Sequence, residues 1–154
     1  MIRPVHPGDA AVIAHHRSPS EADAAERPIY TAWVKAAIQR GLYLGFLALD
    51  GGRVIAGAGL ILLEWGPSRG DPQPWRGRIV NVWTHPDHRR QGLARELVAR
   101  CLEAARERGA TRLNLGTSAE ARGLYEALGF TASRAEMGLA LHPHREARSY
   151  TDSD

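Results

Sequence analysis

The sequence predicts an α/β fold in which a mixed sheet carries helices on its faces. Segments with strand-like patterns alternate along the chain with segments of helical periodicity. Two apolar runs, 42–50 and 53–64, are joined by Gly51 and Gly52, which is a strong signal for a β-hairpin. The clearest helix, 92–108, carries an apolar stripe of the kind that packs on a sheet.

The first part of the chain combines a short apolar segment with helical patterns. It predicts a strand at 2–5 and helices at 10–16, 20–28 and 29–40. Ser20 and Asp23 have the spacing of a capping box, which would begin the second of these helices. Pro28 is expected to break or restart that helix, because proline has no backbone N–H to donate. Gly41 suits the position just after the last helix.

The second strand of the hairpin contains Gly57 and Gly59, which indicate a bulge or the close approach of a ligand. Residues 65–77 are rich in glycine and proline and predict a long loop, and loops of this length are often functional. A further strand is expected at 78–84. The remaining predicted elements are the helix at 92–108, a strand at 112–116, a helix at 120–128, and strands at 130–134 and 135–141.

Composition is that of a globular domain. The chain has 154 residues, of which 44% are hydrophobic and 24% charged, so we expect one domain over 1–142 and a polar tail over 143–154. No apolar run is long enough to span a membrane, and the N-terminus lacks a signal-peptide pattern. Cys101 is the only cysteine and cannot form an internal disulfide, which favours a cytoplasmic location.

The chain carries a formal net charge of +3, and its sequence pI is about 9.5. Such an excess suits an anionic small molecule or a nucleic acid. The basic residues are scattered rather than gathered in blocks, which argues against nucleic acid. The seven histidines have no ligand spacing supported by cysteine or carboxylate clusters, so no metal is expected.

Residues 81–95 are the most informative stretch, because an apolar strand leads through a proline turn to two arginines, a glycine and a helix. The first N–H groups of a helix lack partners within the helix, and its dipole adds positive charge there. Gly92 lets an anion approach the backbone closely, and Arg89, Arg90 and Arg95 can add charge-assisted hydrogen bonds. The stretch therefore favours a phosphate-bearing ligand.

Two motifs carry a resemblance to a known family. Residues 89–94, Arg-Arg-Gln-Gly-Leu-Ala, fit the Arg/Gln-x-x-Gly-x-Gly/Ala pattern. They resemble the acetyl-coenzyme A pyrophosphate loop of the GCN5-related N-acetyltransferases, the GNAT family. Residues 124–130, Leu-Tyr-Glu-Ala-Leu-Gly-Phe, are similar to the second signature of that family. The resemblance covers roughly residues 1–142, although the N-terminal third shares only the general layout.

The resemblance implies a largely antiparallel sheet of six to seven strands, splayed near its middle and flanked by about four helices. Pantetheine would enter the splay between the strands at 78–84 and 112–116. Backbone groups that would pair with pantetheine belong to Val82, Trp83 and Thr84, and one N–H there would polarise the thioester carbonyl. Residues that would hold the pyrophosphate are Arg89, Arg90, Gln91, Gly92, Leu93, Ala94 and Arg95.

Tyr125 is the general acid that the resemblance implies, because a neutral phenol can protonate a leaving thiolate. The alternative is a tyrosine packed against the core. Ser118 stands where many members have an asparagine that bonds the cofactor. Its alternative role is to cap the helix that follows.

The general base is less defined. Many relatives place a glutamate near the start of the strand at 78–84, whereas residues 76–79 here contain no carboxylate. Glu64, at the end of the preceding strand, is the best substitute. The alternatives are a solvated Glu64 paired with Arg76 or Arg78, a base supplied by Asp71 or His85, and a chain of waters.

The leading hypothesis is an N-acetyltransferase that transfers an acetyl group from acetyl-coenzyme A to a primary amine by direct attack in a ternary complex. The alternative is a non-catalytic acyl-coenzyme A sensor or regulatory module. The acceptor is expected to be a small-molecule or peptide amine, with Arg76 and Arg78 hinting at an acidic one. No membrane or nucleic-acid partner is expected, and a homodimer is possible.

Overall fold

The computed structural model describes residues 1–142 and divides the chain into two compact units, Met1–Asn114 and Leu115–Asp154. The first unit is built on a five-stranded sheet with the strand order β1-β2-β3-β4-β5. Its strands are β1 (Ile2–Pro4), β2 (Tyr43–Asp50), β3 (Arg53–Glu64), β4 (Trp75–Thr84) and β5 (Arg112–Asn114). Neighbouring strands are antiparallel except β4 and β5, which run parallel. This is the mixed α/β class that the sequence predicts.

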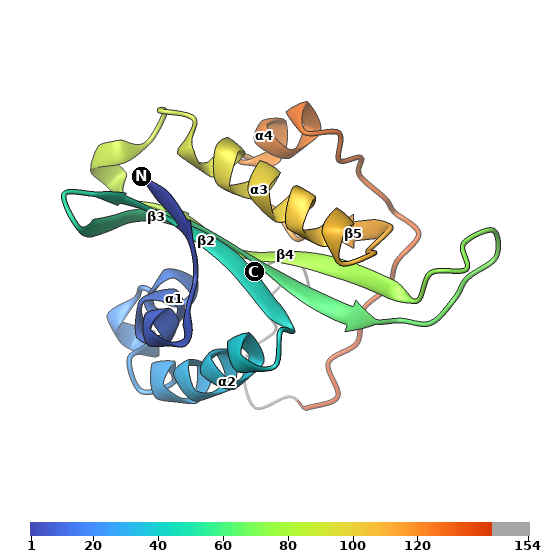
Figure 1. Cartoon of the computed structure of the whole chain (residues 1–154), viewed down its shortest axis with the longest axis horizontal. Coiled ribbons are helices and arrows are strands. Elements are labelled where there is room, and N and C mark those ends of the chain that lie inside the picture. Colours follow the sequence, from blue (N-terminus) through green and yellow to red (C-terminus); the bar gives the residue numbers. More distant parts are fainter. Residues whose placement is uncertain (143–154) are drawn as a thin grey trace. The chain divides into compact units, whose positions relative to one another are not determined.

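Helices cover both faces of this sheet (Figure 1). On one face lie α1 (Ala10–Arg17) and α2 (Arg27–Gln39), with the short 3-10 turns η1 (Pro7–Asp9) and η2 (Glu21–Asp23). On the other lies α3 (Leu93–Glu107), which η3 (Pro86–His88) precedes in the chain. The predicted apolar stripe of α3 is confirmed, since its buried residues are Leu97, Val98, Cys101 and Ala105.

The helix predicted at 20–28 does not form as one element. Pro28 instead restarts the chain as a helix, one of its two expected effects, because it lies in the first turn of α2, where a missing N–H costs nothing. Residues 20–26 form only the turn η2 and a connection. Ser20 still acts as a cap, because its hydroxyl accepts a hydrogen bond from the N–H of Ala22. Gly41 ends the helix with φ of 73°, as predicted.

The β2–β3 hairpin is confirmed at its predicted turn. Gly51 and Gly52 have φ of 57° and 81°, the left-handed pair that a tight two-residue hairpin turn requires. The next strand is longer than predicted, because β4 begins at Trp75 and pairs there with Glu64. The predicted loop is therefore shorter, and it ends at Pro74.

The second unit contains α4 (Arg122–Ala127), which Gly129 follows with φ of 98°. The strands predicted at 130–134 and 135–141 do not form in the described residues, so the described sheet has five strands rather than six to seven. Alternating apolar and polar residues can give a strand one apolar face, but a strand also needs a partner strand for its backbone hydrogen bonds. Met137, Leu139 and Leu141 are accordingly exposed. The tail at 143–154, which includes His144, lies outside the described residues.

No helix in the described part of the chain is both long and apolar enough to cross a membrane.

Candidate functional site

The sheet of the first unit opens along β4. The parallel pairing with β5 covers only Arg76 to Arg78 of β4. From Ile79 to Thr84, β4 is hydrogen-bonded to β3 on one side, and on its other side no strand of the described residues pairs with it. Backbone N–H and C=O groups on such an open edge can bond an extended ligand in the manner of an added strand.

A bulge lies in the middle of this open stretch. Gly59 pairs with Val80 and Gly57 with Trp83, so that Ala58 alone faces two residues of β4. One of these two, Asn81, has φ of 56°, in the left-handed region. The sequence predicted the bulge from the glycines of β3, and the structure places the extra residue on β4. A bulge turns the following backbone groups and side chains away from the regular pleat.

The side chain of Asn81 is 3% exposed, and both its amide nitrogen and its amide oxygen are hydrogen-bonded. Its Nδ2 donates to the hydroxyl oxygens of Tyr30, at 2.9 Å, and Tyr43, at 3.0 Å. Its Oδ1 accepts from Nη1 of Arg17, at 3.2 Å. The Arg17 guanidinium also lies over the Tyr30 ring, 4.8 Å from its centroid. We call these four residues the Asn81 cluster.

The side chain of Trp83 packs against α1. The imidazole of His16 stacks on its indole, with ring centroids 4.2 Å apart. Burial, and to a smaller degree the charge of His15, lowers the pKa of His16 to about 4. The imidazole is therefore neutral near pH 7. Of the adjacent residues His15 and His16, only His15 is exposed.

The turn between β4 and α3 has the backbone shape of an anion site. Arg90 and Gly92 have φ of 63° and 76°, and left-handed residues in a turn direct successive N–H groups into one concavity. No side chain caps α3 at Gly92. Nε of Arg89 donates to the carbonyl oxygen of Thr84, at 3.4 Å, while the side chains of Arg90 and Arg95 are exposed.

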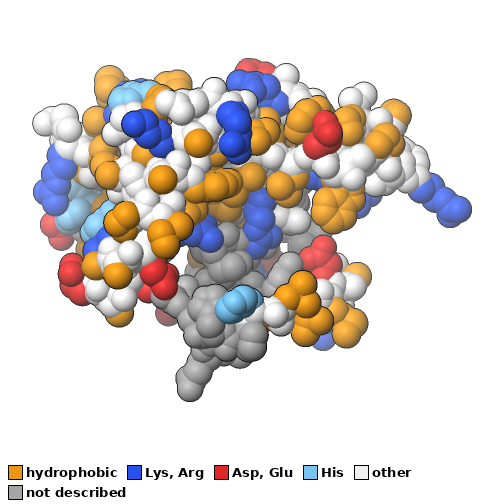
Figure 2. Space-filling model, turned by 90° about the horizontal axis from the view of Figure 1, so that it is seen from below, with side chains coloured by type: hydrophobic (Ala, Val, Ile, Leu, Met, Phe, Trp, Pro, Cys, Tyr) orange, Lys and Arg blue, Asp and Glu red, His pale blue; other side chains and the backbone are white. Residues whose placement is uncertain are grey.

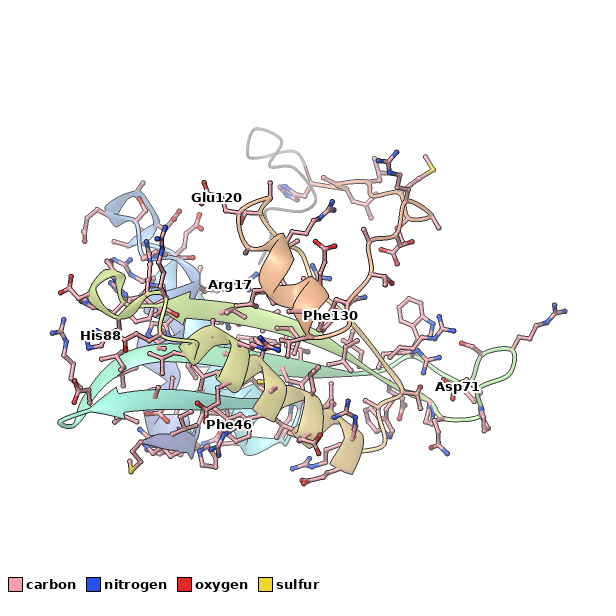
Figure 3. The ribbon with its side chains drawn as sticks, turned by 90° about the horizontal axis from the view of Figure 1, so that it is seen from above. Arg17, Phe46, Asp71, His88, Glu120 and Phe130 are labelled. Atoms are coloured by element: carbon pink, nitrogen blue, oxygen red, sulfur yellow. The ribbon has the colours of Figure 1, made fainter. Side chains whose placement is uncertain are left out.

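Glu64 lies at the opposite end of the β3–β4 pair from this turn. It is exposed and pairs with Trp75, five residues beyond the bulge position Gly59. Five strand residues span about 17 Å. Figure 3 shows the same separation, since Asp71, in the loop beyond Glu64, and His88, before the anion turn, lie at opposite ends. The structure therefore does not bring Glu64 together with the residues of the turn and the bulge.

Arg76 belongs to a buried network rather than to an acceptor surface. It is 9% exposed, its Nη1 lies 3.3 Å from a carboxylate oxygen of Asp71, and it donates to the hydroxyls of Thr111 and Ser68. These contacts tie the 65–74 loop to the start of β5. The sequence's hint that Arg76 faces an acidic acceptor is wrong, because Asp71 neutralises its charge within the fold.

In the second unit, Tyr125 is 7% exposed. Its ring meets Phe130 edge-on, with centroids 6.0 Å apart. Burial raises the pKa of its hydroxyl, so the phenol stays protonated near neutral pH. Ser118 is exposed, and its hydroxyl accepts from the N–H of Ala121, at 3.3 Å, next to the start of α4. The N-cap residue of α4 is Ala121 and no side chain caps this helix, so the contact braces the turn before α4 and is not the expected N-cap bond.

Residues 11–130 match the acetyltransferase (GNAT) family. The chain belongs to the GNAT family. It is therefore an acyltransferase, and the coenzyme A donor that this family generally uses is an anion with a long pantetheine arm. Within the described residues, no group of three or more histidine, cysteine or acidic side chains is placed to hold a metal ion.

Solved structures agree with the family. A GCN5-related N-acetyltransferase from Ralstonia eutropha JMP134 is 27% identical, with a TM-score of 0.81 over 92% of this chain and 97% of the other. An acetyltransferase from Clostridium acetobutylicum, solved with acetyl-CoA, is 21% identical, with a TM-score of 0.83 over 92% and 96%. An aminoglycoside acetyltransferase from an uncultured soil sample is 18% identical, with a TM-score of 0.67 over 92% and 98%. The last two show the fold alone. No curated protein gives a significant match.

Two features of this GNAT chain escaped the sequence reading. Asn81 stands in the apolar run Ile-Val-Asn-Val-Trp, and a polar residue inside a buried strand was the available signal. The sequence gives no sign that His16 is buried, because two adjacent histidines on a helix are ordinarily solvated. The side chains of both residues lie on the side of the sheet that carries α1 and α2. The motifs at 89–94 and 124–130 concern the cofactor and do not describe that side.

Proposed function

We propose that this GNAT enzyme transfers an acetyl group from acetyl-CoA to a primary amine by direct attack of the amine in a ternary complex. One observation carries the proposal. The open edge of β4 runs into a turn with two left-handed residues and then into an uncapped helix start. An extended thiol arm that ends in a pyrophosphate needs this combination of a free strand edge and an anion site.

The donor side of the proposal assigns the open edge to pantetheine. Backbone groups of Val82, Trp83 and Thr84 would bond the arm, and an N–H beside the bulge would polarise the thioester carbonyl. The pyrophosphate would lie on the start of α3. Residues proposed to hold it are Arg89, Arg90, Gln91, Gly92, Leu93, Ala94 and Arg95. Ser118 is kept as a further cofactor contact, in competition with the hydrogen bond that its hydroxyl accepts from the N–H of Ala121.

Tyr125 is proposed to protonate the leaving thiolate. Its raised pKa keeps a proton on the hydroxyl at neutral pH, which a general acid requires. The bond that forms is between the amine nitrogen and the acetyl carbon, and the bond that breaks is between that carbon and sulfur. The sulfur leaves with the electron pair and takes the proton from the phenol.

The base must remove a proton from the attacking amine. Glu64 is kept as the candidate carboxylate, and because about 17 Å of strand separates it from the bulge, it would act through a chain of waters. His16 is closer to the bulge, since it stacks on Trp83, but its imidazole is a weak base. Moving a proton from an amine of pKa near 10 to an imidazole of pKa about 4 is unfavourable by about 8 kcal/mol. We therefore assign no base role to His16.

The acceptor is proposed to be a small-molecule or peptide amine. One structural neighbour is named an aminoglycoside acetyltransferase and another a glucosamine-6-phosphate N-acetyltransferase, and both names denote small amines as acceptors. A nucleic-acid partner is not proposed, because Figure 2 shows Lys and Arg side chains spread among hydrophobic and polar ones on the face that it presents.

Calorimetric titration with acetyl-CoA tests the proposal. Gly92→Glu places a carboxylate at the start of α3 and is expected to abolish binding. The matched control is Gly70→Glu in the exposed 65–74 loop. Gly70 has φ of 77°, close to the 76° of Gly92, and neither glycine has an atom within 4 Å of an added Cβ. The two variants carry the same backbone strain, so only an anion site at Gly92 separates them. A folded wild type that does not bind acetyl-CoA would overturn the proposal.

A further inference from the structure

The bulge residue of β4 is held by its side chain and not only by its backbone. Asn81 and Arg90 are the two non-glycine residues with positive φ in the described part of the chain. This conformation costs most L-residues roughly 1–2 kcal/mol, and asparagine tolerates it best. Arg90 is exposed in a turn, whereas Asn81 lies in the middle of the sheet with all three polar positions of its amide bonded.

The three bonds come from three separate elements. Arg17 is the last residue of α1, Tyr30 lies in the first half of α2, and Tyr43 begins β2. The hydroxyl of Tyr43 lies so close over Gly59 that a Cβ there would be 2.0 Å from it. The amide of Asn81 is therefore fixed from the side of the sheet that carries α1 and α2. Its backbone meanwhile sets the path of β4.

A bulge decides which backbone groups of the next two residues turn toward the open edge. Val82 and Trp83 follow Asn81 directly, and they are the residues to which the proposed function assigns the pantetheine and thioester contacts. Hydrogen-bond donors aimed at a carbonyl lose much of their effect when they move by a fraction of an ångström.

We propose that Asn81 is a positioning residue, whose amide, clamped by Arg17, Tyr30 and Tyr43, holds the β4 backbone in the geometry that polarises the acetyl carbonyl. This inference rests on the proposed function. It adds that α1 and α2 take part in cofactor activation through a side chain that contacts neither coenzyme nor acceptor. Because asparagine donates two bonds and accepts one here, aspartate cannot replace it without reversing both tyrosine hydrogen bonds.

The test uses Asn81→Gly in the full-length protein. Glycine adopts positive φ without strain, so the bulge can persist while the clamp is lost. The probe is acetyl-CoA labelled with carbon-13 at its carbonyl, observed by infrared difference spectroscopy. The wild type is expected to lower the carbonyl stretching frequency of the bound thioester, and Asn81→Gly to return at least half of that shift. Calorimetry with unacetylated CoA is expected to change little, because the pyrophosphate site is intact.

Two further variants complete the design. Tyr30→Phe removes one hydrogen-bond partner of Asn81 from a half-buried position, and it is expected to reduce the frequency shift. It takes the place of Asn81→Gly in the test if that variant fails to fold. Leu62→Ala, a core truncation on β3 away from the bulge, controls for lost stability and is expected to keep the full shift. If Asn81→Gly lowers the carbonyl frequency as much as the wild type does, the inference about Asn81 is wrong and the proposed function still stands. The same result in Tyr30→Phe has this meaning where the glycine variant does not fold. A wild type that binds no acetyl-CoA would overturn the proposed function as well.

Discussion

The imidazole of His16 stacks on the indole of Trp83 with ring planes inclined by only 13° and centroids 4.2 Å apart. The contact joins α1 to the part of β4 that has no β5 partner. Gly57 leaves room for the imidazole, since a Cβ at this position would lie 3.0 Å from Nδ1 of His16. A ring confined in this way has lost much of its hydration, and its pKa falls accordingly.

His16 makes the stability of the fold depend on pH. In the native state its pKa is about 4, against 6.5 as the reference, so between these values the unfolded chain binds a proton that the native protein does not. Stability is therefore lost as the pH falls from 6.5 toward 4. Wild type is expected to lose about 2 kcal/mol more than His16→Phe between pH 7 and pH 5, by urea unfolding.

The control for that comparison is His15→Phe, the same substitution at the exposed neighbouring position. It removes only the smaller cause of the shift, so its pH dependence should follow that of the wild type. Equal slopes for wild type and His16→Phe would mean that His16 titrates normally in the fold.

Glu64 is tested by Glu64→Gln. A base in direct contact with its proton contributes roughly 10²- to 10⁴-fold, and one that acts through water contributes less. We expect kcat/KM to fall about tenfold. Glu107→Gln, at the far end of α3, is the matched control and should leave kcat/KM unchanged. An unaltered Glu64→Gln enzyme would remove Glu64 from the mechanism and leave proton removal to Asp71, His85 or a chain of waters.

Gly59 is expected to tolerate no side chain. A Cβ at this position would lie 2.0 Å from the hydroxyl oxygen and 2.5 Å from Cζ of Tyr43. Tyr43 is 2% exposed and has no space to move, so Gly59→Ala should lower the free energy of unfolding by about 3 kcal/mol. Thermal unfolding measures the loss.

Gly123→Ala provides the comparison for Gly59→Ala. This glycine lies in α4 with no atom within 4 Å of an added Cβ, so alanine should be neutral or stabilise by up to about 1 kcal/mol. A Gly59→Ala protein as stable as wild type would show that Tyr43 can leave the Asn81 cluster without cost.

The elements that sequence predicts best are those whose signals are local. The Gly51–Gly52 turn and the apolar stripe of α3 are each encoded within a few residues, and both form as expected. The turn at 89–92 was located by its residue order, and its left-handed backbone at Arg90 and Gly92 suits the anion site expected there. The sequence could also place a bulge near Gly57 and Gly59, because glycines in a strand indicate irregularity.

Features that depend on distant residues were not predictable in the same way. Asn81 is bonded to tyrosines 51 and 38 positions away in the chain, and no local pattern announces such partners. For the segment 135–141, in contrast, a local pattern predicted a strand that does not form. Its alternation is typical of a strand, but pairing is a property of two segments, and in the described residues no second one is supplied.

Tyr125 is tested by Tyr125→Phe, which deletes one oxygen and keeps the ring against Phe130. Loss of a general acid is expected to lower kcat by about 10²-fold or more, because the thiolate then leaves unprotonated. Affinity for acetyl-CoA should change little, since the proposed binding contacts lie elsewhere. Steady-state kinetics with a series of amines and calorimetry with acetyl-CoA separate the two effects. A variant with unchanged kcat would assign Tyr125 to packing, which its burial also allows, and the proton would then have to come from solvent.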